Sequence, residues 1–313
     1  PKMIPIATSK PKGWSGTFSI SGRGICHGSS LNHGISSQGV TARGSVYGWA
    51  MGDELMRETR PAVVLRGDTP IDYAVSGALW GAGLAWLGGM MGALTVLHRA
   101  VGPRRVQWLE RLYCRGQVAL TGSRWRAVVD PAIDPARAYV FMQNHTNHLD
   151  HCAAYCATGH FKQGVELAEH FRYPIYGRFM RGRGTIPIRT DSASALRELV
   201  RRMREEIAHG NSLLVFPEGT RTLDGHVGPF RQGVFRIVQQ IGAPIVPVTV
   251  TGMYRVMHKG SYVLHPGFDV TAHCDAPIET TGLSRRDVPG LMERVRSAMV
   301  ARLDAYWRQN PPR

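Results

Sequence analysis

The sequence predicts an α/β fold with a central mixed sheet flanked by helices, preceded by an N-terminal apolar membrane-associating helix or helical hairpin. Three observations predict it. From residue 117 onward, short buried strands alternate with amphipathic helices. Ahead of them, residues 73–97 form a run without Asp, Glu, Lys or Arg. Between the two lies a basic stretch, residues 103–116, with the spacing of an amphipathic helix.

Composition sets the outer bounds. The chain has 313 residues, 43% of them hydrophobic, which excludes wholesale disorder. Five cysteines in a chain of this length do not form a disulfide framework, so we expect thiols. The net charge of +15 favours anionic partners: nucleic acid, an anionic membrane or a phosphorylated or CoA-like substrate. No nucleic-acid-binding module is recognisable, so we expect no nucleic-acid partner.

Three segments follow from these patterns. Residues 1–70 are expected to be disordered or a non-native N-terminal extension, because their first fifty are rich in Gly, Ser and basic residues without periodicity. Residues 71–116 are expected to form an apolar membrane anchor followed by a basic amphipathic helix. Residues 117–313 are expected to form the α/β domain.

The apolar segment Tyr73–Leu97 is long enough to cross a bilayer core of about 30 Å. It contains six glycines, including the pair Gly88–Gly89, so a core hairpin broken at that pair stays open as an alternative. Arginines are denser after the segment than before it, which favours a cell-membrane location with the following domain on the cytoplasmic side.

The stretch Pro103–Gly116 places apolar side chains on one helical face and arginines on much of the other. This is the pattern of a helix at a membrane interface, and a solvated helix packed on a core fits equally well. Within the α/β domain, the predicted strands are 117–120, 137–142, 212–216 and 245–250, and the predicted helices are 192–209, 232–241 and 291–307.

The first candidate site is the segment Asn144-His145-Thr146-Asn147-His148-Leu149-Asp150, which follows a predicted strand. A turn can bring the Asp150 carboxylate to the His145 imidazole, which would hold one ring nitrogen as N–H and leave the other free to take a proton. No G-x-S-x-G serine motif is present. The sequence therefore favours a histidine general base that activates a hydroxyl.

The second candidate site is Phe216-Pro217-Glu218-Gly219-Thr220-Arg221-Thr222, which follows another buried strand. Gly219 permits a tight turn and close approach of a ligand to the backbone. Arg221 offers a planar guanidinium suited to phosphate, and Glu218 can accept from a ligand hydroxyl or pair with an arginine.

Together, in this order, the two segments resemble the lysophospholipid and glycerol-phosphate acyltransferase family, typified by 1-acylglycerol-3-phosphate acyltransferases. The resemblance covers about residues 117–250. It includes a second block, Gly184-Thr185-Ile186-Pro187-Ile188-Arg189, and a fourth, Ala243-Pro244-Ile245-Val246-Pro247-Val248. Two positions depart from the family pattern: Arg189 comes one residue early, and Leu167 stands where the family has a lysine.

The resemblance implies that His145 is the base and Asp150 its orienting partner. It also implies that the substrate is bound by Glu218, Gly219, Thr220 and Arg221, together with Arg189 of the second block. The expected reaction transfers a fatty acyl group from acyl-CoA or acyl carrier protein to a lysophospholipid hydroxyl at the membrane. The most favoured acceptor is 1-acylglycerol-3-phosphate, which would yield phosphatidic acid. This chemistry requires no cofactor and no metal.

A different reading starts from the same segment. The H-x-H-x-D-H ligand pattern of metallo-β-lactamase-like hydrolases is matched at all but one position by Thr146, His148, Asp150 and His151. Thr146 occupies the place of the first histidine, and a hydroxyl is a poor zinc ligand beside imidazole. This alternative, with His148, Asp150 and His151 as ligands, also leaves the second candidate segment unexplained.

Overall fold

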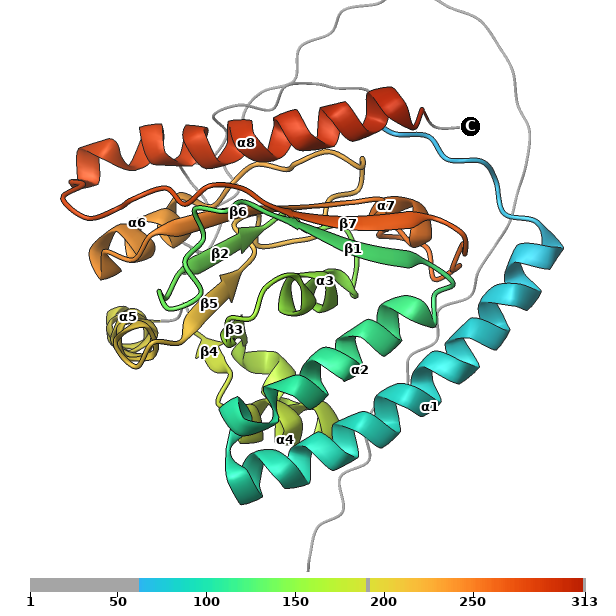
Figure 1. Ribbon diagram of the computed structural model, residues 1–313, viewed down its shortest axis with the longest axis horizontal. Coiled ribbons are helices and arrows are strands. Elements are labelled where there is room, and N and C mark those ends of the chain that lie inside the picture. Colours follow the sequence, from blue (N-terminus) through green and yellow to red (C-terminus); the bar gives the residue numbers. More distant parts are fainter. Residues whose placement is uncertain (1–61, 190–191, 312–313) are drawn as a thin grey trace, which may run out of the picture. The chain divides into compact units, whose positions relative to one another are not determined.

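The computed structural model describes residues 62–189 and 192–311 (Figure 1). Most of the N-terminal segment predicted to be disordered, residues 1–61, therefore lies outside the described residues. Its described end, residues 62–69, is extended and contacts the domain. The Val63 N–H donates to the Asp224 carbonyl at 2.9 Å, and Asp68 Oδ1 lies 3.0 Å from His265 Nε2.

The centre of the domain is a seven-stranded sheet in the order β1-β7-β6-β2-β5-β3-β4. The strands are β1 (Arg124–Val129), β2 (Val140–Gln143), β3 (Lys162–Leu167), β4 (Ile186–Ile188), β5 (Ser212–Val215), β6 (Ile245–Thr251) and β7 (Asp269–Cys274). Neighbouring strands are parallel except β6 and β7, which are antiparallel. The predicted mixed sheet is confirmed.

The three central strands, β2, β5 and β6, are buried along their whole length. This burial explains their nearly continuous apolar sequences, because a parallel strand covered on both faces has no polar side to expose. The carboxyl ends of all three meet at one edge of the sheet, since they run parallel. Loops that leave these ends are therefore brought together.

Helices cover both faces of the sheet (Figure 1). On one face lie α1 (Pro70–Val101), α2 (Gln107–Ala119), α3 (Asp150–Ala157) and α4 (Pro174–Arg183), and on the other α5 (Ala193–Ala208), α6 (Gln232–Ile241) and α8 (Val288–Gln309). The short helices are η1 (Pro103–Val106), η2 (Ala168–Arg172), α7 (Met253–Val256) and η3 (Arg285–Asp287). Each face has its own hydrophobic cluster.

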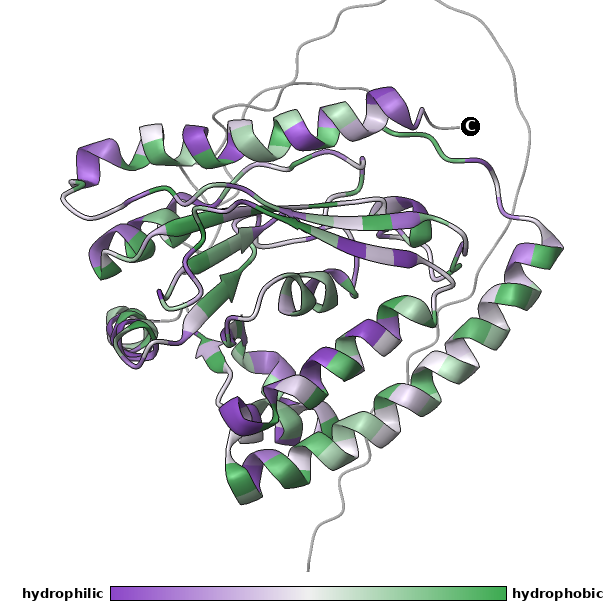
Figure 2. Cartoon of the chain, in the orientation of Figure 1, coloured by the Kyte–Doolittle hydropathy of each residue, from purple (hydrophilic) through white to green (hydrophobic). Residues whose placement is uncertain are grey.

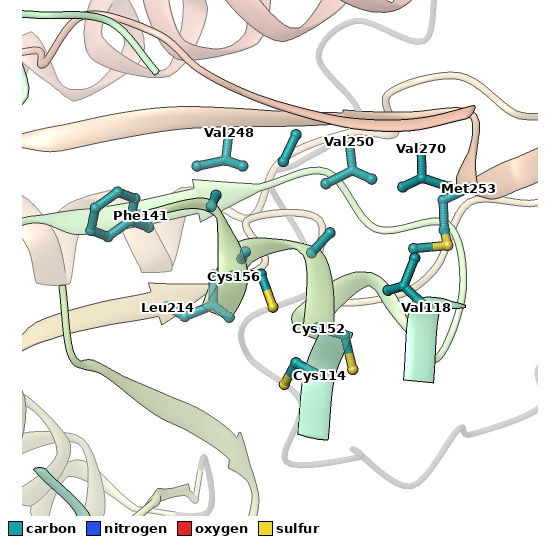
Figure 3. Close-up of a cluster of buried hydrophobic side chains, with 14 of the residues drawn as sticks. Cys114, Val118, Phe141, Cys152, Cys156, Leu214, Val248, Val250, Met253 and Val270 are labelled. Carbon is teal, nitrogen blue, oxygen red and sulfur yellow. The ribbon is translucent and has the colours of Figure 1, made fainter. Parts of the chain in front are cut away.

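The hydrophobic cluster around α3 contains free cysteine thiols (Figure 3). Cys114, Cys152 and Cys156 pack with Phe141 and Val248 in this core. All four cysteines of the described residues are free and buried. A small buried thiol behaves as an apolar side chain, so the Cys152–Cys156 spacing is explained by core packing.

The apolar segment forms one continuous helix, α1, and the hairpin alternative is wrong. Thr69 caps the helix in a capping box with Asp72, Pro70 occupies the first turn, and Gly102 ends it. A helical glycine costs only about 1 kcal/mol relative to alanine, so two glycines alone do not end a helix whose side packs on a domain. Figure 2 shows α1 as mostly apolar, and by length and composition it could cross a membrane.

The predicted strand at residues 117–120 is also wrong, because Gln117, Val118 and Ala119 form the last turn of α2. Gln117 and Val118 are buried beside Tyr113 and Cys114, four residues earlier on the same helical face. The basic amphipathic helix predicted at 103–116 is therefore the pair η1 and α2, and it ends three residues later than expected.

Candidate active site

The two candidate segments meet at the carboxyl edge of the sheet, because they follow the adjacent parallel strands β2 and β5. Two hydrogen bonds join the loops through the backbone of His145. Its N–H donates to Glu218 Oε1 at 2.8 Å, and its carbonyl accepts from the Thr222 N–H at 2.8 Å. The second segment thus fixes the backbone position of the histidine in the first.

The side chain of His145 contacts the buried carboxylate of Asp150, with Nδ1 2.9 Å from Oδ2. Asp150 is the first residue of α3, and its carboxylate also accepts from the backbone N–H groups of Thr146 and Asn147 and from the Thr146 hydroxyl. These donors fix the carboxylate, and the carboxylate in turn orients the imidazole. The turn predicted between the two residues is present.

The other side of the imidazole is open. The ring stacks on Phe216 with centroids 4.1 Å apart, and the side chain is 23% exposed. Its Nε2 makes no hydrogen bond with the part of the chain that the structure describes. With Nδ1–H bonded to Asp150, Nε2 carries the lone pair that can accept a proton.

Two asparagines hold the loop around His145. The Asn144 amide bonds both backbone groups of Val250 on β6, through Nδ2 at 3.1 Å and Oδ1 at 2.7 Å. The Asn147 amide donates to the carbonyls of Met253 and Met257. Both side chains are fully buried, so these bonds satisfy groups that would be costly to leave unpaired.

Glu218 is placed as a support for His145. It is 3% exposed, and its second oxygen, Oε2, accepts from the Gly228 N–H at 2.9 Å. Burial raises the pKa of Glu218 to about 8, although the two backbone hydrogen bonds act in the opposite direction. This burial and these bonds favour a positioning role over the direct substrate contact that the sequence predicts.

Residues 219–221 of the second segment form a turn at the surface, in which Arg221 is half-buried. Gly219 has φ +67°, a left-handed conformation that favours glycine, and both Gly219 and Thr220 are exposed. The Arg221 guanidinium makes no hydrogen bond or ion pair with any of the described side chains. Burial, and then the charge of Arg221, lower the pKa of the nearby His148.

A second basic residue, Lys259, contacts this turn, and the sequence alone did not indicate it. Its ammonium donates to the Thr220 hydroxyl and to the Arg221 carbonyl, both at 3.1 Å. It lies in a loop after α7, 38 residues beyond Arg221 in the chain. No motif surrounds it, so only the tertiary structure brings this second cation to the turn.

Arg189 lies apart from these groups. It is exposed at the end of β4, and its guanidinium makes no hydrogen bond or ion pair with another described residue. Strand β4 is three positions from β2 in the sheet, which at about 4.8 Å per strand places the two strands roughly 14 Å apart. Its predicted contact with substrate stays a prediction.

The residues of the alternative metal site are not arranged as ligands. Among residues 62–189 and 192–311, no group of three His, Cys, Asp or Glu side chains is placed to hold a metal ion. The carboxylate of Asp150 is occupied by His145 and the donors of the loop. His151 contacts Cys152 instead, with Nε2 3.4 Å from Sγ.

Part of the chain is similar to known acyltransferases. Residues 127–251 match the family model named Acyltransferase. The chain is 31% identical over 139 residues to the chloroplastic 1-acyl-sn-glycerol-3-phosphate acyltransferase BAT2 of Brassica napus, covering 44% of this chain and 40% of that protein. It is 34% identical over 90 residues to 1-acyl-sn-glycerol-3-phosphate acyltransferase alpha of Homo sapiens, covering 28% of this chain and 30% of that protein.

The chain therefore spans less than half the length of these two curated relatives. Among solved structures, it resembles the 1-acyl-sn-glycerophosphate acyltransferase PlsC of Thermotoga maritima with a TM-score of 0.61. The match covers 76% of this chain and 98% of that one at 21% identity, which establishes a shared fold.

Proposed function

We propose that this chain, whose residues 127–251 match the Acyltransferase family model, transfers a fatty acyl group from a thioester to the free hydroxyl of a lysophospholipid. The acceptor we propose is 1-acylglycerol-3-phosphate, the acceptor in the names of the curated relatives. The observation that carries the proposal is the His145–Asp150 pair, with one ring nitrogen bonded and the other open.

In this reaction, His145 Nε2 takes the proton of the acceptor hydroxyl while Asp150 stabilises the imidazolium that forms. The acceptor oxygen attacks the thioester carbonyl, and the tetrahedral intermediate collapses to an ester as the thiolate leaves. The proton on Nε2 passes to the departing sulfur, so His145 returns to its starting state. Every group in these steps belongs to the chain or to the two substrates.

The turn at residues 219–221 supplies the site that we propose for the acceptor's phosphate. Arg221 has no competing carboxylate among the described residues, and Lys259 adds a second positive charge beside it. A guanidinium binds phosphate through paired N–H donors. Because the turn is joined to the backbone of His145 through Thr222, a phosphate held there would lie near the base.

We propose that α1 lies against the membrane with its outer face instead of crossing it alone. Its inner face is held by the domain: Leu264 N–H donates to Ser76 Oγ, Trp86 Nε1 donates to the Tyr113 carbonyl, and His98 Nε2 lies 2.9 Å from Glu110 Oε1. These contacts extend over about 33 Å of helix.

The outer face of α1 remains apolar, with exposed large side chains at Ile71, Val75, Leu84 and Val96. The neighbouring α2 adds the exposed side chain of Trp108. An apolar stripe bordered by arginines suits an anionic interface, where a lysophospholipid enters from the lipid side and the acyl-CoA or acyl carrier protein from water. The flanking arginines support a cytoplasmic orientation at the cell membrane.

The deciding experiment compares His145→Ala with His209→Ala in the purified chain. Labelled acyl-CoA or acyl carrier protein is supplied with a panel of lysophospholipids, and the products are separated by mass. Loss of a general base lowers the rate by about 10²–10⁴-fold, so we expect His145→Ala to lose nearly all acyl transfer.

His209 is an exposed residue at the end of α5 and serves as the matched control, which should keep full activity. A folded His145→Ala protein with normal acyl transfer would contradict the proposal. Stoichiometric zinc in the wild type that is lost on changing His148 would instead support the hydrolase alternative.

A further inference from the structure

A large cavity lies away from the candidate active site, on the face of the sheet that carries α8. Its volume is about 830 Å³, within the range of about 300–1,000 Å³ typical of small-molecule sites. Strands β1 and β7, the carboxyl end of α8 and the extended residues before α1 form its walls. None of His145, Asp150, Glu218 and Arg221 lines it.

Arginines dominate the charge of this cavity. Its charged lining residues are Arg66, Arg124, Arg126, Arg255, Arg302 and Asp269. Carboxylates compensate three of the arginines: Arg124 pairs with Asp269, Arg66 with Asp72, and Arg302 with Asp275.

Two arginines of the cavity have no carboxylate partner among residues 62–189 and 192–311. Arg126 Nε donates only to the hydroxyl of Thr271, which leaves its two terminal nitrogens without a hydrogen bond to the described residues. Arg255 donates to the backbone carbonyls of Asn310 and Pro311, and no described residue accepts from its buried Nε. The cavity therefore holds two full positive charges that the described carboxylates do not neutralise.

The neighbouring His273 is also short of a partner. It pairs with Val128 of β1, and its buried Nδ1 makes no hydrogen bond with the described residues. Burial, and then the positive charges of Arg302 and Arg126, lower the pKa of this imidazole, with Asp275 acting in the opposite direction. The positive charges of the cavity thus disfavour protonation of His273, one of its lining residues.

We propose that this cavity binds a soluble organic phosphate, whose phosphate groups pair with Arg126 and Arg255. Guanidinium groups bind phosphate through two parallel hydrogen bonds, which the two terminal nitrogens of Arg126 can supply, whereas Arg255 offers its charge and its remaining terminal nitrogen, Nη1. The two positive charges match a ligand with two or more negative charges. The volume exceeds that of inorganic phosphate, and Phe268 and Tyr306 give the remainder an apolar lining. The cavity lies on the α8 face of the sheet, whereas α1 and α2 cover the other face (Figure 1). Because α1 is the proposed membrane contact, the α8 face points to water, and this favours a soluble ligand.

The test measures binding of adenosine 3′,5′-bisphosphate to the full chain by calorimetry, with inorganic pyrophosphate as a second probe. The diagnostic variant is Arg126→Gln, because glutamine can still donate to Thr271 on this exposed strand. Loss of a charge-assisted hydrogen-bond pair should weaken binding by about tenfold or more. The exposed Arg197→Gln on α5 is the matched control and should bind as the wild type does.

A third variant, Arg221→Ala, separates this cavity from the candidate active site, and it should keep the affinity of the wild type. Absence of binding at millimolar probe, or equal affinity in Arg126→Gln and wild type, would overturn the proposal. Binding confined to vesicles that contain phosphatidic acid, with no binding of either soluble probe, would assign the cavity to a lipid headgroup and overturn the soluble ligand.

Discussion

At the scale of single residues, the two loops of the candidate site depend on each other. His145 owes its ring orientation to Asp150 and its backbone position to Glu218 and Thr222. A side chain that supports the base without touching substrate should affect turnover more than acceptor binding. Glu218 is the residue on which this distinction can be tested.

Glu218→Gln should lower kcat while leaving the acceptor KM nearly unchanged, because the amide keeps only one acceptor for the two backbone N–H groups. The same variant tests the protonation of Glu218. Its pKa is about 8 in the folded protein against an ordinary 4.5, so between these values the folded state holds a proton that the unfolded chain has lost. Wild-type stability due to this residue is therefore present at low pH and falls as pH rises from about 4.5 to 8.

The measurement is the free energy of unfolding by urea for both proteins across this pH range. The advantage of wild type over Glu218→Gln should decline as pH rises. A difference that does not change with pH would mean that Glu218 is ionised in the folded protein throughout.

Arg221→Ala should mainly raise the KM for a phosphorylated acceptor, by about tenfold or more, since a charge-assisted contact is lost. Lysophospholipids whose phosphate is replaced by a neutral group provide the internal comparison, and Arg197→Ala the matched control. If the variant loses the same factor with the neutral acceptors, Arg221 is structural and the phosphate site lies elsewhere.

At the scale of elements, α1 has two different faces. The inner face carries the buried residues Ser76, Met91, Leu94 and His98, and the outer face is apolar but exposed. A helix with both features contributes to folding through one side and is free to contact lipid through the other.

The outer face can be tested separately by the double change Leu84→Glu and Val96→Glu. These side chains are 54% and 66% exposed, so the fold should be retained while the affinity for lipid falls. Flotation with anionic vesicles measures the bound fraction, and thermal unfolding in detergent checks the fold. The matched control is the same pair changed to Ala, which should float much more than the Glu variant.

An unchanged bound fraction in the Glu variant would remove α1 from the membrane contact. Leu94→Glu should affect the fold instead of the affinity for lipid, because that side chain is fully buried against the domain. It should unfold the protein whether or not lipid is present.

At the scale of the whole molecule, a buried ionic cluster joins α1, α2 and α4 to the sheet. Arg183 donates to both carboxylate oxygens of Glu110 and to the Lys162 carbonyl on β3, and His98 lies against the same carboxylate. Burial opposes ionisation of Glu110, but the charge of Arg183 and its hydrogen bonds prevail and lower the pKa of Glu110. The helical layer and the sheet thus share one charged contact.

Arg183→Met should cost about 3–5 kcal/mol of unfolding free energy, because it leaves Glu110 buried without its cation. The double variant Glu110→Leu, Arg183→Met should recover much of this loss, since no charge remains to be compensated. Urea unfolding measures both, with the exposed Arg178→Met as control. A double variant as unstable as the single one would mean that the cluster acts through shape instead of charge.

The sequence by itself determined the α/β class, the helix at 232–241, the helix predicted at 192–209 and observed at 193–208, and the two loops that carry His145 and Arg221. These features are encoded locally: a hydrophobic period, a cap at Ser192 or a glycine after a helix is visible within a few residues. The same holds for α1, whose uncharged run predicted an apolar helix, although local signals did not decide between one helix and two.

Only the tertiary structure decided the rest. Residues 117–120 look like a strand by composition but continue α2, because burial of Gln117 and Val118 follows a helical spacing. The edge strand β1 is largely exposed and carries two arginines, and its neighbour β7 has polar residues among its apolar ones, so no continuous apolar run indicated either strand. Lys259 reaches the site, Glu218 turns inward and Arg126 lines a cavity because distant segments meet in space. Such contacts depend on which strands become neighbours, and no short stretch of sequence contains that information.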